Sequence, residues 1–331
     1  MTTAELDHAQ WIPGERTGHY ESFFLRANHP TRALAFWIRY TIFSPHHAPE
    51  EARGELWAIW FDGESGSHLA LKSEIPAKYC VLSRDELKVV LGHATLGPYE
   101  AQGAVSGHGR AISWALEYAC DERPLLLLPE RLYRGGFPRA KALVPAPMAR
   151  FRGRVVVDGH EMQINDWVGS RNHNWGSRHT DSYAWGQVAG FDSRPDAFLE
   201  VATARIKIGP WLTPPATMLV LRMGSREHRV ANLRHAFGVQ AKLEGFTWTF
   251  HADLRDIAVR GVISAPAAAF VGLSYANPPG GTKHCLNTKL ASCELVVGDK
   301  TTGNVEQLLS AKRAAFEILT DRRDHGIEIR A

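Results

Sequence analysis

The segment ALAFWIRYTIF, residues Ala33–Phe43, decides the fold class because its β-branched and aromatic side chains favour a strand over a helix. Successive side chains of a strand point to opposite faces, so alternate residues form two sets. One set is largely apolar and comprises Phe36, Ile38, Tyr40 and Ile42. The other set contains a cation and comprises Trp37, Arg39, Thr41 and Phe43. The segment predicts a β-strand with two different faces.

The same pattern recurs along the chain and indicates an all-β protein. GELWAIWFDG (Gly54–Gly63) and FTWTFHADL (246–254) have the same composition. Asp158-Gly159 lies between two alternating runs in GRVVVDGHEMQIND and predicts a tight hairpin. The chain holds 10 Trp, 14 Phe and 8 Tyr with 29 Gly and 18 Pro, which is typical of aromatic strands joined by frequent turns. Because strands do not alternate with long helical patterns, a parallel α/β sheet is not expected.

One segment near the end of the sequence has helical spacing instead. In NVEQLLSAKRAAFEILTDRR, the apolar residues recur every three or four positions. Asn304 followed by Gln307 resembles a capping box at the start of a helix. The sequence therefore predicts a C-terminal amphipathic helix over Asn304–Arg322, packed on a sheet or across the mouth of a barrel.

A proline-rich break indicates where the chain divides into two domains. The segment GPWLTPPATM (Gly209–Met218) follows directly after a predicted strand. We therefore expect an N-terminal β domain over residues 1–209 and a C-terminal β domain over residues 210–331.

Composition and charge exclude several classes of partner. The net charge of +3 is spread over 331 residues without a long basic run, so nucleic acid is not an expected partner. No apolar stretch reaches the length of a membrane-spanning helix, and MTTAELDHAQW lacks the features of a secretory signal. The four cysteines lack metal-binding or disulfide spacing. A cytoplasmic protein with reduced thiols is expected, and the sequence does not indicate its oligomeric state.

The stretch DWVGSRNHNWGSRHTDSYAWGQV (Asp166–Val188) is the densest cluster of polar and aromatic residues in the chain. His173 and His179 are six residues apart, which matches none of the tight spacings that preset metal ligands. The chain also lacks a GxSxG nucleophile elbow and a glycine-rich phosphate-binding loop in the required strand–helix context. The sequence therefore predicts neither a metal nor a cofactor.

Acid–base chemistry beside aromatic rings therefore remains as the candidate chemistry of this stretch. Alternation places His173 and Trp175 on one side of the chain and Asn172 and Asn174 on the other. An imidazole beside an indole suits a cavity for an unsaturated apolar group, because the ring stabilises positive charge and the histidine relays a proton. The alternative interpretation is that His173 hydrogen-bonds to backbone while Trp175 fills the core.

Glu200 is the second candidate acid. In AFLEVATA, one face carries Phe198, Glu200, Ala202 and Ala204. A carboxyl group above small alanines in an apolar cavity has a raised pKa and can act as a general acid. Alternatively, Glu200 faces solvent or pairs with an arginine such as Arg178 or Arg205. Arg39 is in turn expected to pair with a buried carboxylate such as Glu21.

Three segments resemble one known family. HNWG followed by YAWGQV is similar to the signature of the carotenoid 1,2-hydratase/AttH-like family (hydroxyneurosporene synthase type), which is related in fold to tocopherol cyclase. HYESFFLRANHPTRALAFWIRYTIF (His19–Phe43) resembles its first strands, and YANPPGGTKHCLNTKLASCEL (Tyr275–Leu295) resembles its closing hairpin. The resemblance implies two lipocalin-like β-barrels or sandwiches packed face to face, with an apolar pocket near their contact.

The resemblance also implies cofactor-free, proton-driven hydration or cyclisation of isoprenoid double bonds, or pericyclic ring closure of polyenes. The His and Trp of the family's H-x-W motif line the pocket, and they correspond to His173 and Trp175. The family's acidic residue with a nearby Tyr has no clean match. Glu200 lies at a comparable distance along the chain, but its nearest tyrosine is Tyr183.

The sequence thus predicts a lyase (hydratase) or isomerase/cyclase that acts on a hydrophobic, unsaturated small molecule. The predicted catalytic residues are His173, Trp175 and Glu200. The predicted substrate-binding residues are Trp37, Arg39, Asn174, Tyr183 and Trp185. A non-catalytic carrier of an apolar ligand is the main alternative, and an interaction scaffold with a filled interior is a third.

Overall fold

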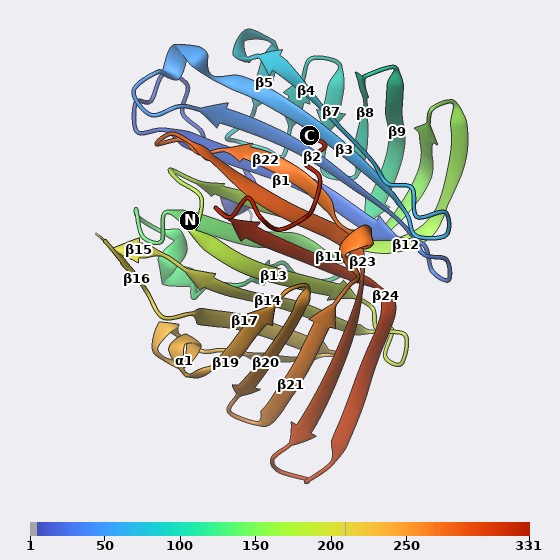
Figure 1. Cartoon of the computed structure of the whole chain (residues 1–331), viewed down its shortest axis with the longest axis vertical. Helices are drawn as coiled ribbons and strands as arrows, with labels where there is room; N and C mark the ends of the chain where they lie inside the picture. The colour runs from blue at the N-terminus through green and yellow to red at the C-terminus, as the bar shows by residue number, and fades with distance from the viewer. Residues whose placement is uncertain (1–4, 209) are drawn as a thin grey trace.

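The computed structural model describes residues 5–208 and 210–331 and shows two large antiparallel β-sheets packed against each other (Figure 1). In Figure 1 the blue-to-green strands form the upper sheet, and the yellow-to-red strands form the lower one. We call them sheet A and sheet B. The prediction of an all-β, lipocalin-like protein with two packed β units is confirmed.

Sheet A contains the strands from the first half of the chain, in the spatial order β4-β3-β2-β1-β12-β11-β9-β8-β7-β6-β5. β4 lies against β8, so the sheet curves into a nearly closed barrel. Its strands are β1 His19–Asn28, β2 Leu34–Ser44, β3 Arg53–Asp62, β4 Leu69–Pro76, β5 Cys80–Leu82, β6 Val89–Leu91, β7 Ala94–Leu96, β8 Glu100–Gly107, β9 Arg110–Ala119, β10 Leu125–Leu126, β11 Ala140–Val157 and β12 His160–Gly176.

Sheet B has the order β18-β17-β14-β13-β24-β23-β21-β20-β19, with β22 paired to β23. Its strands are β13 Ser182–Ala189, β14 Ala197–Arg205, β17 Ala216–Met223, β18 Arg226–Arg229, β19 Gln240–Glu244, β20 Thr247–Asp253, β21 Ile257–Ser264, β22 Val271–Ala276, β23 Thr282–Asp299 and β24 Val305–Thr320. The remaining elements are β15 Lys207–Ile208, β16 Trp211–Leu212, α1 Leu233–Gly238, and the 3-10 turns η1 Glu5–Asp7, η2 Pro49–Glu51, η3 Ala77–Tyr79, η4 Glu130–Tyr133 and η5 Ala267–Ala269.

The two clearest local predictions are confirmed. The segment Ala33–Phe43 contains β2, whose even-numbered side chains Phe36, Ile38 and Tyr40 enter the core inside sheet A, whereas Trp37 faces sheet B. Asp158 and Gly159 form the two-residue turn between β11 and β12, with φ angles of 49° and 82°. Two consecutive positive φ angles match the right-handed twist of a hairpin, which explains the Asp-Gly pair.

The predicted C-terminal helix is wrong, because Val305–Thr320 forms the long strand β24. β24 pairs with both β13 and β23, and a register irregularity lies opposite Ala291. Before the irregularity only one side of β24 is buried, whereas Ala314–Leu319 is buried on both sides between the two sheets. In the first half of β24 apolar side chains alternate with polar ones, and in the second half they are continuous. Together the two halves give apolar residues three or four positions apart, as in a helix.

The chain passes from sheet A to sheet B between Gly176 and Ser182. The predicted domain boundary falls on Gly209, which lies outside the described residues, and its neighbours belong to the small β15–β16 ladder after the first two strands of sheet B. The proline-rich segment therefore belongs to the connection between the neighbouring strands β14 and β17 of sheet B.

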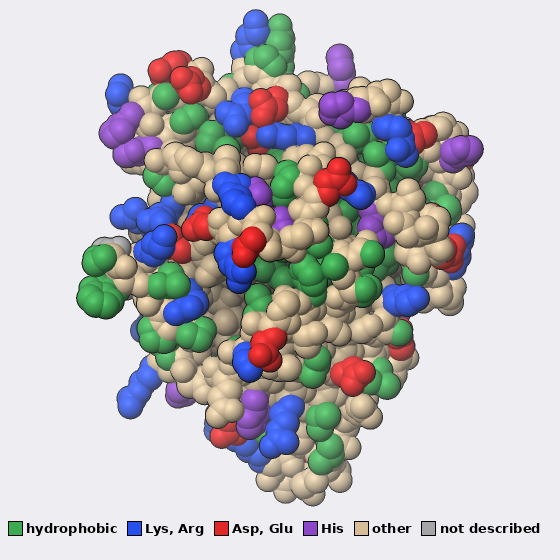
Figure 2. Space-filling view, in the orientation of Figure 1, with side chains coloured by type: hydrophobic (Ala, Val, Ile, Leu, Met, Phe, Trp, Pro, Cys, Tyr) green, Lys and Arg blue, Asp and Glu red, His purple; other side chains and the backbone are tan. Residues whose placement is uncertain are grey.

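One face of sheet A packs against one face of sheet B. Phe24, Trp37 and Trp57 from sheet A pack with Trp185 and Leu273 from sheet B in one buried cluster. Charged side chains of both signs are interspersed over the visible surface in Figure 2. No helix among the described residues is long and apolar enough to cross a membrane.

Candidate functional site

A buried carboxyl group lies at the centre of the contact between the sheets. Glu200 of β14 is 2% exposed, and it shares a face of sheet B with Trp185 and Gln187 of β13. Trp185 Nε1 donates to Glu200 Oε1 at 2.7 Å, and Gln187 Nε2 donates to Oε2 at 2.7 Å. The expectation that Glu200 lies on an inward strand face is confirmed, because its side chain is buried. The alternative of a solvent-exposed Glu200 is wrong.

The surroundings of Glu200 favour its protonated form. Burial raises the pKa of Glu200 to about 7, although the hydrogen bonds from Trp185 and Gln187 and the charge of Arg26 act in the opposite direction. A carboxyl group with a pKa near neutrality holds its proton for part of the time at physiological pH. Such a group is suited to general acid catalysis.

Small side chains lead from Glu200 toward solvent. Ala202 and Ala204 follow Glu200 on the same face of β14, and both are partly exposed. They lie opposite Trp185 and Tyr183 of β13, respectively. Small alanine side chains therefore separate Glu200 from the exposed end of β14, beside the aromatic side chains of β13.

Sheet A supplies a polar network that holds Gln187. The Gln187 carbonyl oxygen accepts hydrogen bonds from Arg26 Nε at 2.7 Å and from Ser170 Oγ at 2.6 Å. Its amide nitrogen also donates to Asn172 Oδ1 at 2.9 Å. Because these partners are fully buried and lie on β1 and β12, the orientation of Glu200 depends on residues from both sheets.

A second buried carboxylate lies beside the first on sheet B. Glu317 of β24 lies directly opposite Trp185 in the strand register and accepts from Lys289 Nζ at 2.8 Å and from Asn287 Nδ2 at 3.0 Å. Tyr183 OH donates to its other oxygen at 3.4 Å. Burial lowers the pKa of Lys289, whereas Glu317 raises it. The Lys289 ammonium lies 5.4 Å from the ring centre of Trp185 and 5.8 Å from that of Trp37.

Arg39 faces sheet B but does not pair with Glu21. Its Nε and Nη2 donate to Ser22 Oγ at 2.9 and 2.5 Å, and its guanidinium lies 4.3 Å from the ring centre of Tyr275. Glu21 instead points to the other face of β1, because neighbouring residues of a strand alternate. The expected pairing of Arg39 with Glu21 is therefore wrong.

His173 and Trp175 lie on the face of β12 that points into sheet A. His173 Nε2 lies 2.7 Å from Glu21 Oε1, and its Nδ1 lies 3.0 Å from the Leu6 carbonyl oxygen. The Leu6 carbonyl oxygen can only accept, so Nδ1 is the donor of that hydrogen bond. The imidazole also stacks on Phe23 and Trp175, with ring-centre distances of 4.0 and 4.6 Å.

Glu21 is the acceptor that holds this arrangement. It also accepts from the backbone N–H of Gln10 and Trp11 and from His19. Burial by itself raises the pKa of Glu21, but the hydrogen bonds from His173 and His19 lower it to about 2. The contacts of His173 match the alternative interpretation, in which it hydrogen-bonds to backbone and Trp175 packs in the core.

The structure thus separates the residues predicted for one site. Trp37, Arg39, Tyr183, Trp185 and Glu200 gather between the sheets, and half-buried Asn174 shares the face of β12 that points to sheet B. His173 does not hydrogen-bond to Glu200 but to groups on the opposite side of sheet A.

Several members of the cluster between the sheets were not predicted from the sequence. Two-residue alternation in YAWGQV groups Gln187 with Tyr183 and Trp185, and this signal was available. Glu317 was hidden because its segment was predicted as a helix. The polar residues missed include Ser22, Arg26, Asn28, Ser170, Asn172, Gln187, Asn287, Lys289 and Glu317.

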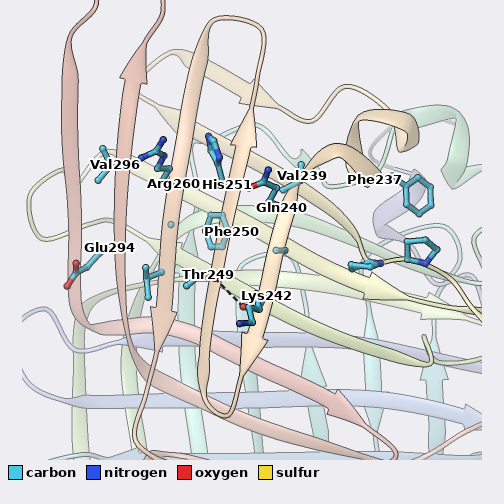
Figure 3. Close-up of a pocket in the computed structure, with 15 residues that line it drawn as sticks. Phe237, Val239, Gln240, Lys242, Thr249, Phe250, His251, Arg260, Glu294 and Val296 are labelled. Carbon is cyan, nitrogen blue, oxygen red and sulfur yellow. Dashed lines mark hydrogen bonds between the residues drawn. The ribbon is translucent and has the colours of Figure 1, made fainter.

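A separate pocket of about 660 Å³ lies on the solvent-exposed face of sheet B (Figure 3). Its lining comes from α1, β19, β20, β21 and β23 and the loop that precedes β17, and it includes Phe237, Lys242, Thr249, Arg260, Val262 and Val296. None of the residues predicted from the sequence as catalytic or substrate-binding lines this pocket.

Among the described residues, no group of three or more His, Cys, Asp or Glu side chains is arranged to hold a metal ion. His179, the other histidine considered as a metal ligand, stacks on Tyr20 with 3.9 Å between the ring centres. We expect dialysis against a chelator to leave the melting temperature and ligand binding unchanged. Stoichiometric metal in elemental analysis, lost together with activity in His173→Ala, would contradict this expectation.

The raised pKa of Glu200 predicts a specific pH dependence of stability. Between its usual value near 4.5 and about 7, the native state binds a proton that the unfolded state has released. The contribution of Glu200 to stability is therefore largest below pH 4.5 and falls as pH rises to 7, by at most about 1.4 kcal/mol per pH unit. Urea titrations of wild type and Glu200→Gln across pH 4–8 measure it, and parallel curves for the two proteins would refute it.

Comparisons with known proteins agree with the fold. Neither protein-family models nor curated protein sequences match the chain. A candidate AttH protein from Nitrosomonas europaea is similar in structure, with a TM-score of 0.58 and 12% identity over 97% of this chain and 96% of the other. Kievitone hydratase from Nectria haematococca has a TM-score of 0.57 and 9% identity, over 97% of this chain and 93% of the other. The structure of CghA with Sch210972 has a TM-score of 0.57 and 12% identity, over 97% of this chain and 96% of the other. At these identities the similarity shows the fold.

Proposed function

We propose that this protein is a cofactor-independent enzyme of the carotenoid 1,2-hydratase/AttH type that acts on a hydrophobic, unsaturated small molecule of isoprenoid or polyene class. The reaction is proton-driven hydration, cyclisation or isomerisation. The observation that carries the proposal is Glu200, a fully buried carboxyl group with a pKa raised to about 7 beside an indole ring. The structural similarity to kievitone hydratase supports a hydratase among the three reactions.

In the proposed reaction, the carboxyl proton of Glu200 adds to one carbon of a double bond and leaves a carbocation on the other. The ring faces of Trp37 and Trp185 stabilise that charge. Glu317 neutralises the ammonium of Lys289, whose charge would otherwise oppose the cation. In hydration, water adds to the cation and then loses a proton. In cyclisation, a second double bond adds and moves the charge to another carbon, which then loses a neighbouring proton, and in isomerisation the first cation loses a neighbouring proton directly. In each case the proton that is released returns to Glu200.

A carrier of an apolar ligand is the second candidate, and one observation favours it. Both oxygens of Glu200 and both ring nitrogens of His173 have hydrogen-bond partners, and a carrier needs no free acid. The two candidates differ in what happens to the bound molecule. Mass spectrometry of small molecules that co-purify with the protein identifies the ligand class, and incubation of that ligand with fresh protein tests turnover.

The product of that incubation separates the reactions. Hydration gives a product that is one water heavier than the ligand, whereas cyclisation and isomerisation give a product of equal mass and different retention time. A carrier returns the ligand unchanged at every enzyme concentration, and this result would refute the enzymatic proposal.

A further inference from the structure

Four hydrogen-bond donors form a contiguous block on the face of sheet A that points to sheet B. Arg26 of β1 lies directly opposite Trp37 of β2, and Arg39 of β2 lies directly opposite Trp57 of β3. Trp37 and Arg39 are two residues apart on one strand and so share a face. Directly opposite residues have Cβ atoms about 4.5–5.5 Å apart, so Arg26 is a neighbour of Trp37, and Arg39 is a neighbour of Trp57. We call them the donor patch.

The donor patch has more donors than acceptors. Arg26 Nη2, Trp37 Nε1 and Trp57 Nε1 are buried and have no hydrogen-bond partner among the described residues. Arg26 is 0% exposed, and both tryptophans are 1% exposed. A buried donor without a partner costs about 1–3 kcal/mol. Arg26 lies opposite Trp37, and Trp57 lies diagonal to Trp37 on the next strand, so the three donors share one face and indicate that an acceptor atom belongs at the patch.

The two arginines of the patch have no ion-pair partner, although Glu200 acts on Arg26, and Glu55 and Glu317 act on Arg39, at longer range. Among the described residues, neither Arg26 nor Arg39 has a carboxylate within ion-pair distance, and Arg39 donates only to the Ser22 hydroxyl. The nearby Lys289 is already neutralised by Glu317. Buried guanidinium groups without a carboxylate partner favour an anionic or strongly polarised oxygen.

We infer that the donor patch binds an oxygen atom of the substrate, so that the substrate is an unsaturated molecule with a carbonyl, enolate or carboxylate group rather than a pure hydrocarbon. This inference rests on the proposed function and adds the substrate class to it. Arg26 connects the patch to the acid, because its Nε donates to Gln187 at 2.7 Å and Gln187 donates to Glu200 at 2.7 Å. The oxygen end binds sheet A, and the unsaturated chain extends toward Glu200 on sheet B.

Three polyenes of matched length test the inference: all-trans-retinoic acid, retinal and the hydrocarbon axerophtene. Binding is measured through tryptophan fluorescence quenching. We expect wild type to bind the acid and the aldehyde about tenfold or more tightly than the hydrocarbon. Trp37→Phe and Trp57→Phe remove one donor each and keep an aromatic ring, so each is expected to reduce this preference severalfold.

Trp60→Phe is the matched control. Trp60 lies on β3 like Trp57, but it points into the core of sheet A beside Trp167. We expect this variant to keep the preference of wild type. In nitrogen-15 spectra with labelled indoles, the N–H signals of Trp37 and Trp57, assigned from the Phe variants, should move when the acid or aldehyde binds but not with the hydrocarbon.

Equal affinity for all three polyenes, or no binding of any, would overturn the inference, and unshifted indole signals would show that buried water alone fills the patch. Turnover is scored separately. A protein that prefers oxygenated polyenes but converts none of them refutes the proposed enzyme and supports the donor patch. A protein that converts the hydrocarbon as well as the acid supports the proposed enzyme and refutes the donor patch.

Discussion

Glu200→Gln is expected to lower the rate of product formation on the order of a hundredfold or more, because it removes the proton that initiates the reaction. The substitution keeps the size of the side chain and one of its two acceptor oxygens, so the contact with Trp185 or Gln187 is partly preserved. Single-turnover reactions with the co-purified ligand, followed by mass spectrometry, measure the rate. Ligand binding should change far less than turnover.

Glu227→Gln is a suitable control for this experiment. Glu227 lies on β18 of the same sheet and pairs with Arg222 and Arg229 outside the cluster of Glu200. Its substitution should leave the rate within about twofold of wild type once stability is matched. If Glu200→Gln reacts at the rate of wild type, the assignment of the general acid is wrong. A mild effect of Glu200→Gln with a large effect of Trp185→Ala, at the indole that contacts Glu200, would indicate pericyclic ring closure directed by shape.

Trp185→Phe provides an independent check on the same acid. The indole N–H lowers the pKa of Glu200 by hydrogen bonding to its charged form. Without this donor, the pKa rises, and the protonated acid persists to higher pH. The alkaline limb of the rate profile should therefore move to higher pH. A purely structural role of Trp185 would lower the rate at every pH without moving the limb.

Lys289→Met is expected to lower the free energy of unfolding by about 3–5 kcal/mol, because it leaves Glu317 buried without its cation. Both partners are buried, with Lys289 at 0% and Glu317 at 7% exposure. The double variant Lys289→Met/Glu317→Leu removes both charges and should recover much of the loss. Urea unfolding at constant m-value measures all three proteins.

The exposed pair of Arg32 and Glu64 is the matched control. It has bidentate geometry but side chains that are 46% and 43% exposed. Arg32→Ala should lower the free energy of unfolding far less than Lys289→Met does, since solvent screens an exposed pair. A loss below 1 kcal/mol in Lys289→Met would show that the pair between the sheets does not stabilise the protein.

The fold was predictable from sequence where one face of a strand differs from the other. β2 and the Asp158-Gly159 turn follow from alternation and backbone preference alone. β24 was not predictable in this way, because its second half is buried on both sides by contacts with residues far away in the sequence. The change between sheets was missed since the short connection 177–181 contains no proline-rich break.

The candidate site was predictable only in part. Alternation placed Glu200 and Trp185 on inward faces, and the structure joins them directly. For His173, alternation predicts which residues share its face of the strand. It does not predict whether that face points toward the second sheet. That choice is set by Leu6 and Glu21, whose contacts with His173 span more than 150 positions of sequence. Local sequence does not encode such contacts.

The order in which the strands close has a consequence for folding during synthesis. β1 pairs with β12, so sheet A lacks its central pair until Gly176 has been made. β13 pairs with β24, so sheet B waits for residues up to Thr320. A nascent chain therefore completes its first unit while the second still exposes unpaired strand edges. Ribosome-bound chains that stop shortly before β24 should accordingly be protease-resistant in the first half and dependent on chaperones in the second.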